Sequence, residues 1–416
     1  MLKRQLSEIY LTANVEAHKQ AFAKLNKLHL ELFNESPDHL FSSPGRTEIS
    51  GNHTDHNNGK VIAASINLDT KAVVKKNDTT IVKIISEGFP NPFIVDVSDP
   101  EIKDDEKETT PALIRGIATR LKHLNHHIGG FNAVITSDVL QGSGLSSSAS
   151  VEVLITAIFN NLYNNGKIPN QELAKISQYA ENNYFGKPCG LMDQMACAMG
   201  NIIAIDFQDA NNPKVKKIDF DFNKTEYRLV VLDTGASHAD LTDDYAAIPK
   251  EMKEIATYFG KNNCREINEN SFLSALPDLK ETVNQRGILR VLHFFNENKR
   301  VDKQIMALEN QRIEDFLSLV KESGDSSFKY LQNIFTPKNY SRQDVSLALA
   351  LTENFLKEIK SGACRIHGGG FAGTIQVFLP SDQVREYINF ISPIFGPDSA
   401  QVLTIRTVGV TEIKNF

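Results

Sequence analysis

The stretch Gln141–Ser150, which reads QGSGLSSSAS, constrains the fold more than any other part of the chain. A strand-like apolar segment, Phe131–Leu140, precedes it, and a pattern typical of one helix face follows from Val151 to Leu162. A glycine-rich turn at a helix start presents free backbone N–H groups, and the helix dipole favours negative charge there. The stretch therefore predicts a phosphate site, although an ordinary serine cap or linker has the same composition.

Three further stretches combine glycines with chemically active side chains. They read PGRTEISGNHTDHNNGK at Pro44–Lys60, GKPCGLMDQ at Gly186–Gln194 and RIHGGGFAG at Arg365–Gly373. The P-loop pattern Gly-x-x-x-x-Gly-Lys-Ser/Thr does not occur, which excludes that class of phosphate site. The string HGGG is also found in esterases, but the Gly-x-Ser-x-Gly nucleophile elbow that such an enzyme needs is missing.

In this order, the four stretches resemble the motifs of GHMP-superfamily sugar kinases, and specifically of galactokinases. Gly45-Arg46 followed by Gly51-Asn52-His53-Thr54-Asp55-His56 is similar to the first motif, GLSSSAS to the second and HGGGFAG to the third. The resemblance runs from about Phe41 to the C-terminus. It implies an α+β fold of two GHMP kinase domains, residues 1–215 and 216–416, with the active site in the cleft between them. The implied reaction is ATP-dependent phosphorylation of the anomeric hydroxyl of galactose.

The resemblance also implies a role for each motif. Asp193 matches the catalytic aspartate, which orients the sugar hydroxyl or removes its proton, and Arg46 matches the catalytic arginine. Sugar contacts are expected from Asn52, His53, Asp55, Gly190 and Tyr245. ATP contacts are expected from Gly142, Ser143, Gly144, Leu145, Ser146, Ser147, Ser148 and Ala149, with Ser147 or Ser148 as the Mg²⁺ ligand. The third loop, Gly368, Gly369 and Gly370, is expected to close over phosphates or substrate.

Two of these residues also have a purely structural interpretation, and one position departs from the family pattern. Asp193 could cap a helix or form an internal salt bridge, and Tyr245 could be a buried tyrosine bonded to the backbone. Asn52 stands where galactokinases usually have the glutamate that contacts the sugar near O6, and His56 stands where they have tyrosine. An alternative substrate is therefore galacturonate or another C6- or C2-modified hexose. A non-catalytic sugar-sensing regulator is a second alternative, disfavoured by the complete GLSSSAS motif and by Asp193.

Composition and patterning limit the remaining possibilities. A length of 416 residues favours two domains, and a net charge of −6 argues against a nucleic-acid partner. No apolar run approaches the roughly 18 residues that span a bilayer, and no secretion signal is recognisable. The four cysteines lack metal-site spacing, so we expect free thiols in a reducing cytoplasm. The oligomeric state stays open.

The secondary-structure expectations that bear on the site are few. Residues 36–60 are rich in glycine and proline and are predicted as a binding loop rather than as core. Short β-type runs at Val61–Ile66 and Lys71–Lys75 predict two strands. Helices are predicted over Asp243–Phe259 and Ser346–Lys360, the latter stopped by a glycine.

Overall fold

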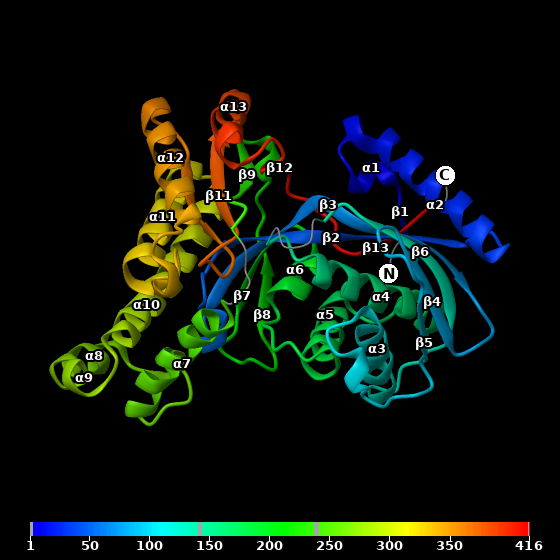
Figure 1. The fold of residues 1–416 in the computed structure, drawn as a ribbon, viewed down its shortest axis with the longest axis horizontal. Coiled ribbons are helices and arrows are strands. Elements are labelled where there is room, and N and C mark those ends of the chain that lie inside the picture. Colours follow the sequence, from blue (N-terminus) through cyan, green and yellow to red (C-terminus); the bar gives the residue numbers. More distant parts are fainter. Residues whose placement is uncertain (1–2, 140–143, 237–240, 415) are drawn as a thin grey trace.

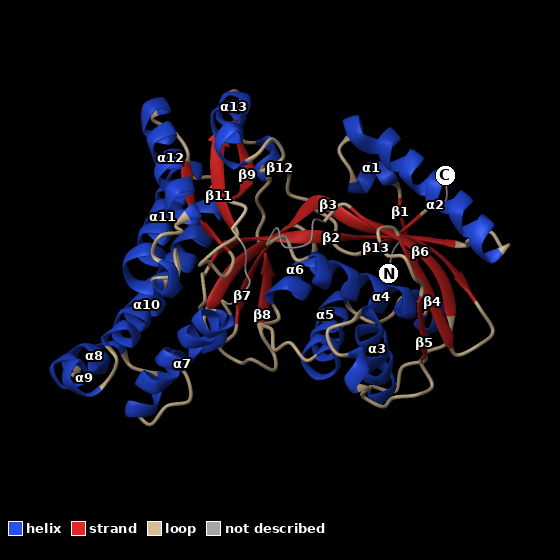
Figure 2. Ribbon diagram, in the orientation of Figure 1, coloured by secondary structure: helices blue, strands red, loops and turns tan. Residues whose placement is uncertain are grey.

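The computed structural model describes residues 3–139, 144–236, 241–414 and 416, so Gly142 and Ser143 of the expected phosphate loop lie outside the described residues. In the described part, a nine-stranded and a four-stranded sheet organise the chain (Figures 1 and 2). The larger sheet consists of β1 (Lys3–Arg4), β2 (His39–Ser50), β3 (Lys60–Lys76), β4 (Ile81–Ser86), β5 (Phe93–Asp96), β6 (Phe131–Ser137), β7 (Ile202–Asp206), β8 (Lys214–Lys217) and β13 (Thr411–Ile413).

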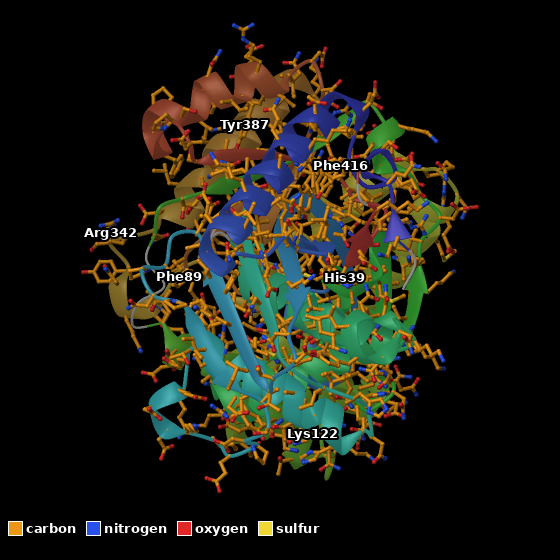
Figure 3. All side chains as sticks on the ribbon, turned by 90° about the vertical axis from the view of Figure 1, so that its right-hand side faces the viewer. His39, Phe89, Lys122, Arg342, Tyr387 and Phe416 are labelled. Carbon is orange, nitrogen blue, oxygen red and sulfur yellow. The ribbon has the colours of Figure 1, made fainter. Side chains whose placement is uncertain are left out.

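Helices cover both faces of the larger sheet. One face carries a continuous apolar core with alternate residues of β3 and β6, because side chains of a strand alternate between the faces of a sheet. The helices on this face are α3 (Thr110–His123), α4 (Ser147–Asn164), α5 (Asn170–Ala180) and α6 (Met192–Met199). On the opposite face, α1 (Leu6–Ile9) and α2 (Val15–Phe33) pack against Val73 and Val134. Figure 3 shows α2 crossing this face beside the C-terminal Phe416, whose ring meets Phe22 edge-on.

The smaller sheet has the order β10-β11-β9-β12 and lies between two helical layers. Alternate residues of β9 enter two different cores: Val230 packs with α12 and α13, and Val231 with α10 and α11. The strands are β9 (Tyr227–Asp233), β10 (Ala363–His367), β11 (Thr374–Pro380) and β12 (Ala400–Leu403). The helices of this half are α7 (Thr242–Tyr258), α8 (Glu269–Ser274), α9 (Leu276–Thr282), α10 (Gln285–Glu309), α11 (Ile313–Ser326), α12 (Asp344–Ile359) and α13 (Val384–Phe395).

The two sheets separate along the chain after β8, between Lys217 and Tyr227. One element departs from a simple two-part division. The last strand, β13, leaves the second half and pairs with β2 and β1 of the first sheet. The expected boundary between residues 215 and 216 lies inside β8 (Lys214–Lys217). We therefore propose two units that meet in the segment between β8 and β9, with β13 as a strand that returns to the first unit.

The first motif differs from its expectation as a loop. Residues 39–50 form β2, which is buried over nearly its whole length and pairs with β3. Pro44 and Gly45, which suggested a turn, lie at a register shift in this pairing. Glycine is needed there because a Cβ on Gly45 would lie 2.8 Å from the Leu145 carbonyl oxygen. The motif is therefore a rigid strand that packs against the phosphate loop, and only residues 51–59 form a loop.

The second difference concerns β3. The two strands expected at 61–66 and 71–75 are one 17-residue strand. Asp69, which interrupted the apolar pattern, is fully buried, because Lys71 and Arg406 neutralise its charge. No helix of the described residues combines the length and apolar character needed to span a bilayer.

Candidate active site

Arg46 on β2 and Asp193 in the first turn of α6 form the centre of the candidate site. Arg46 Nε donates to Asp193 Oδ1 at 2.7 Å, and Nη2 donates to Oδ2 at 2.8 Å. The Asp193 side chain keeps 33% of its surface exposed, whereas that of Arg46 keeps 9%. Two parallel hydrogen bonds fix both planes, so the carboxylate is held from behind and stays accessible from the front.

The start of the phosphate loop's helix contacts the same pair. Ser146 Oγ donates to Asp193 Oδ2 at 2.5 Å, and the Gly144 carbonyl accepts from Arg46 Nη1. The Arg46 backbone N–H donates to the Leu145 carbonyl at 3.0 Å. α4 begins directly afterwards, at Ser147. The helix N-terminus that the sequence assigned to a phosphate therefore lies next to the Arg46–Asp193 pair.

The charge state of Asp193 follows from these contacts. Partial burial raises the pKa of its carboxyl, but the Arg46 guanidinium and the Ser146 hydroxyl outweigh this and lower the pKa below the usual 3.8. Asp193 is therefore ionised at neutral pH. An ionised carboxylate can accept a hydrogen bond from a substrate hydroxyl and take its proton when that oxygen becomes more acidic during reaction.

A cavity of about 290 Å³ opens in front of this pair. Its lining contains six of the chemically relevant side chains or glycines, namely Arg46, Glu48, His53, Asp55, Gly190 and Asp193. Gly190 is required by close packing, because a Cβ there would lie 2.4 Å from Asp55 Oδ2. The GLMDQ stretch thus supplies both the carboxylate of Asp193 and the space that the Asp55 carboxylate occupies.

The third motif closes one side of the cavity through Gly368 and Gly369. His53 Nε2 donates to the Gly369 carbonyl at 2.8 Å, which identifies the protonated ring nitrogen. Burial, together with the neighbouring His56, lowers the pKa of His53 to about 4, so the ring is neutral at pH 7. The loop after β2 and the loop after β10 are therefore joined by a neutral histidine.

Several expected site residues have other surroundings. Asn52 is fully buried, and its amide is bonded entirely to protein atoms. Tyr245 lies beneath the third loop. A Cβ on Gly369 would lie 2.6 Å from its ring, and its hydroxyl donates to the Gly370 carbonyl at 2.9 Å. Burial raises the pKa of Tyr245 to about 12. Neither residue is part of the cavity lining, so both support the loops from below.

The remaining phosphate-loop residues differ in exposure. In the first turns of α4, Ser148 is exposed, Ser147 half-buried and Ala149 buried in the core. Neither the Ser147 nor the Ser148 hydroxyl is bonded to another described side chain. The described residues contain no group of three histidine, cysteine or acidic side chains that could alone hold a metal ion.

Sequence reasoning missed the groups that hold the first motif in place. Arg365 on β10 donates to Glu48 Oε1 at 2.7 Å and to the Ile49 carbonyl at 2.9 Å. From α10, Glu297 accepts from the Gly51 N–H at 3.2 Å, and His293 contacts the Asn52 carbonyl at 2.9 Å. His293 and Glu297 are four residues apart, so the sequence could have predicted that they are neighbours on one helix face. Nothing in the sequence indicated that this face meets the first motif.

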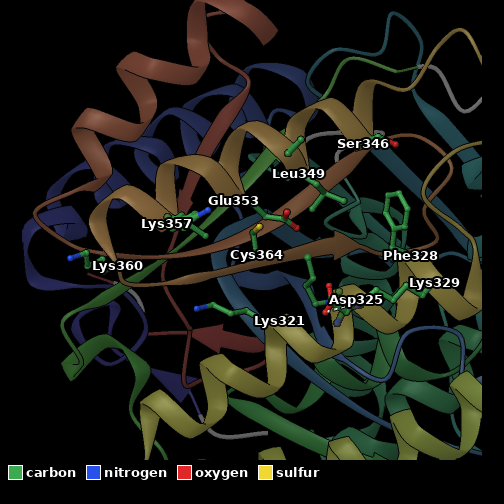
Figure 4. Close-up of a pocket in the computed structure, with 14 residues that line it drawn as sticks. Lys321, Asp325, Phe328, Lys329, Ser346, Leu349, Glu353, Lys357, Lys360 and Cys364 are labelled. Carbon is green, nitrogen blue, oxygen red and sulfur yellow. Dashed lines mark hydrogen bonds and ion pairs between the residues drawn. The ribbon is translucent and has the colours of Figure 1, made fainter.

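A second cavity, of about 710 Å³, lies between α11 and α12 over Cys364 of β10 (Figure 4). Lysines at positions 321, 329, 357 and 360 surround it, and Phe328 and Leu349 form its apolar part. None of the site residues expected from the sequence lines it. It is therefore separate from the cavity at Asp193.

Known proteins are similar to this chain in both sequence and fold. The model for the GHMP kinases N-terminal domain matches residues 112–201, and the galactokinase galactose-binding signature matches residues 27–76. A galactokinase of Clostridium tetani (strain Massachusetts / E88) is 30% identical over 303 residues, which cover 72% of this chain and 76% of that protein. The chain belongs to the galactokinase family of the GHMP kinases.

Solved structures agree with this membership. The Lactococcus lactis galactokinase complexed with galactose superposes with a TM-score of 0.79 at 25% identity, covering 94% of this chain and 99% of that one. The mevalonate kinase of Methanococcus jannaschii shares the fold at 16% identity, with a TM-score of 0.62 over 88% of this chain and 98% of that one. The expected α+β GHMP kinase fold is thereby confirmed, and the protein is a kinase of the galactokinase type.

Proposed function

We propose that this protein transfers the γ-phosphoryl group of ATP to the anomeric hydroxyl of galactose, giving galactose 1-phosphate and ADP. The observation that carries the proposal is the Arg46–Asp193 pair, which borders both the cavity and the start of α4. Phosphoryl transfer depends mainly on positioning and on stabilising charge. This arrangement brings together a carboxylate that can accept the hydrogen bond of the sugar hydroxyl, the positive charge of Arg46, and a helix N-terminus that can bind an anion.

Each residue then has a defined task. Asp193 accepts the hydrogen bond of the anomeric hydroxyl and aims its oxygen at the γ-phosphorus. The new P–O bond forms as the bond to the β,γ-bridging oxygen breaks, ADP leaves, and the hydroxyl proton passes to Asp193. Because Arg46 lowers the pKa of Asp193, the carboxylate is a weak base that takes the proton late. Asp55 and His53 are proposed to bind the sugar hydroxyls.

The residues at the start of α4 fit ATP and Mg²⁺. Backbone N–H groups of the stretch 142–149 would hold the phosphates. The hydroxyls of Ser147 and Ser148 are oxygen ligands of the kind Mg²⁺ prefers, and phosphate oxygens would complete the shell. When bound, Mg²⁺ would neutralise charge on the phosphates. The cytoplasmic localisation expected from the unpaired cysteines stays a prediction.

An ADP-release assay against a panel of monosaccharides tests the function. The panel should include galactose, its epimers, galacturonate, 6-deoxygalactose and 2-amino-2-deoxygalactose. We expect galactose to give the highest kcat/KM, with phosphate found on the anomeric oxygen by NMR. Release of ADP with none of the hexoses, or a higher kcat/KM for a sugar outside the galactose series, would contradict the proposal.

A further inference from the structure

Glu48 is a buried carboxylate in the wall of the active-site cavity to which the sequence motifs assign no role. Its residue surface is only 5% exposed, yet it is one of the lining residues. A carboxylate is costly to bury unless it is paired, and Arg365 supplies the counter-charge behind it. A charged group that is held from behind and borders a substrate cavity is placed to bind something inside that cavity.

The position of Glu48 along β2 defines which end of a substrate it meets. Arg46 and Glu48 are two residues apart in a regularly paired part of the strand, opposite Ser65 and Ala63. Side chains at this spacing lie on the same face and about 7 Å apart along the strand. That distance is comparable to the length of a hexose. Because Arg46 holds Asp193, a sugar whose anomeric hydroxyl meets Asp193 would have its far end within reach of Glu48.

The hydrogen bonds of Glu48 leave one oxygen for a ligand. Both side chains that donate to the carboxylate use Oε1: Arg365 Nη2 donates at 2.7 Å and Asn52 Nδ2 at 3.1 Å. Among the described residues, Oε2 has no hydrogen-bond partner, and it is not one of the fully enclosed unpaired atoms. Oε2 is therefore available to a hydroxyl in the cavity.

Asn52 orients this carboxylate and has no free atom for the sugar. Its Oδ1 accepts from Asn333 Nδ2 at 2.8 Å and from Ser327 Oγ at 3.3 Å. Its Nδ2 donates to Glu48 Oε1 and to the Gly368 carbonyl. These partners fix which end of the amide carries the nitrogen. The amide of Asn52 therefore helps to hold the Glu48 carboxylate in its orientation.

We propose that Glu48 is a specificity-determining residue that accepts a hydrogen bond from the C6 hydroxyl of the sugar and repels a carboxylate at C6. The acid missing at position 52 is thus supplied from the strand, four residues earlier. This inference rests on the proposed function. It assigns the C6 end of the cavity an acceptor, which disfavours uronates as substrates.

The unaltered protein provides the first test. Its kcat/KM is measured for galactose, 6-deoxygalactose and galacturonate under identical ATP and Mg²⁺. Loss of a hydrogen bond to a charged group is worth about ten- to a hundredfold. We expect 6-deoxygalactose to lose at least tenfold and galacturonate more than that. A 6-deoxygalactose value equal to that of galactose overturns the proposal.

The variant Glu48→Gln provides the second test. Glutamine keeps an acceptor toward Arg365 and Asn52 but turns a donor toward the cavity. We expect the galactose-to-galacturonate ratio of kcat/KM to fall at least tenfold, with the affinity for ATP unchanged. The matched control is Glu412→Gln, a buried glutamate of the same sheet that pairs with Lys3 and contacts His39, and it should leave the ratio unchanged.

The outcomes distinguish a failure of the proposed function from a failure of the role inferred for Glu48. If the unaltered protein phosphorylates none of the galactose-type sugars, the proposed function fails before any variant is made. If it phosphorylates galactose and Glu48→Gln lowers kcat/KM equally for galactose, 6-deoxygalactose and galacturonate, Glu48 has only a structural role and the inference fails alone.

Discussion

At the scale of single residues, the contacts of Asp193 lead to a kinetic prediction. Asp193→Asn places an amide nitrogen against Arg46 or Ser146, which are both donors in the present arrangement. We expect kcat to fall by about 10²–10⁴-fold, whereas calorimetry should show ATP affinity changed little. The control is Asp302→Asn, an exposed acid that pairs with Lys60. Turnover of Asp193→Asn within a factor of three of the parent would remove Asp193 from the reaction.

Gly190 leads to a second prediction at this scale. In Gly190→Ala the new methyl group would overlap Asp55 Oδ2, so the Asp55 carboxylate must move. We expect KM for the sugar to rise about tenfold or more, as for a lost charged hydrogen bond, with KM for ATP unchanged. Steady-state kinetics with each substrate varied in turn measures both values. Equal changes in the two constants would show that Gly190 does not act through the sugar subsite.

The sequence predicted Arg46 and Asp193 as partners, and the structure brings them together from positions 147 residues apart. It could not predict Glu48 as a lining residue. Pro44 and Gly45 favoured a turn, so the two-residue alternation that places Arg46 and Glu48 on one face was not applied there. The resemblance to galactokinases assigns Asn52 to the sugar, and the sequence does not reveal its partners Asn333 and Gly368 because they are distant along the chain.

At the scale of elements, α10 anchors the loop after β2 through Glu297. Burial opposes ionisation, but His293, Arg300 and Arg365 lower the pKa of Glu297 to about 2, from an ordinary 4.5. Because the folded-state pKa is the lower one, the ionised group stabilises the fold above pH 4.5, and this contribution is lost as the pH falls toward 2. Glu297 should therefore contribute to the loss of stability on the acid side of the pH profile.

The corresponding prediction compares two acids that meet the same arginine. Glu297→Gln should lower the free energy of unfolding at pH 7 by about 3–5 kcal/mol, as for a broken buried ion pair. Glu322→Gln removes an exposed acid 3.6 Å from Arg300 and should change it by less than about 1 kcal/mol. Urea unfolding at pH 7 and at pH 3 measures both. A difference that is as large at pH 3 as at pH 7 would contradict the assigned pKa.

Helices were the elements best predicted from the sequence. The expected segments 243–259 and 346–360 correspond to α7 (Thr242–Tyr258) and α12 (Asp344–Ile359). Their apolar periodicity is local, so no distant contact is needed to recognise it. The sequence predicts two strands in place of β3 because Asp69 interrupts the apolar pattern. Lys71 and Arg406 neutralise this acid, and Arg406, 337 residues away, could not be recognised as a partner from the local sequence.

At the scale of the whole molecule, Asp69 joins both ends of the chain. Tyr10 donates to its Oδ2 at 2.5 Å, Arg406 donates to the same oxygen at 3.0 Å, and Lys71 donates to Oδ1 at 2.6 Å. Asp69→Asn should loosen both termini, so limited proteolysis should cut before residue 20 and after residue 400 sooner than in the parent. Asp138→Asn is the matched control, because Asp138 contacts the same lysine from the surface. Cleavage that is equally fast in both variants would contradict a special role for Asp69.

The return of β13 to the first sheet has a consequence for biosynthesis. During translation, residues 411–413, which pair with both β1 and β2, are synthesised after every other described strand of that sheet. This edge of β2 therefore stays unpaired while the whole second half of the chain is being made, and β1 gains its described strand partner last.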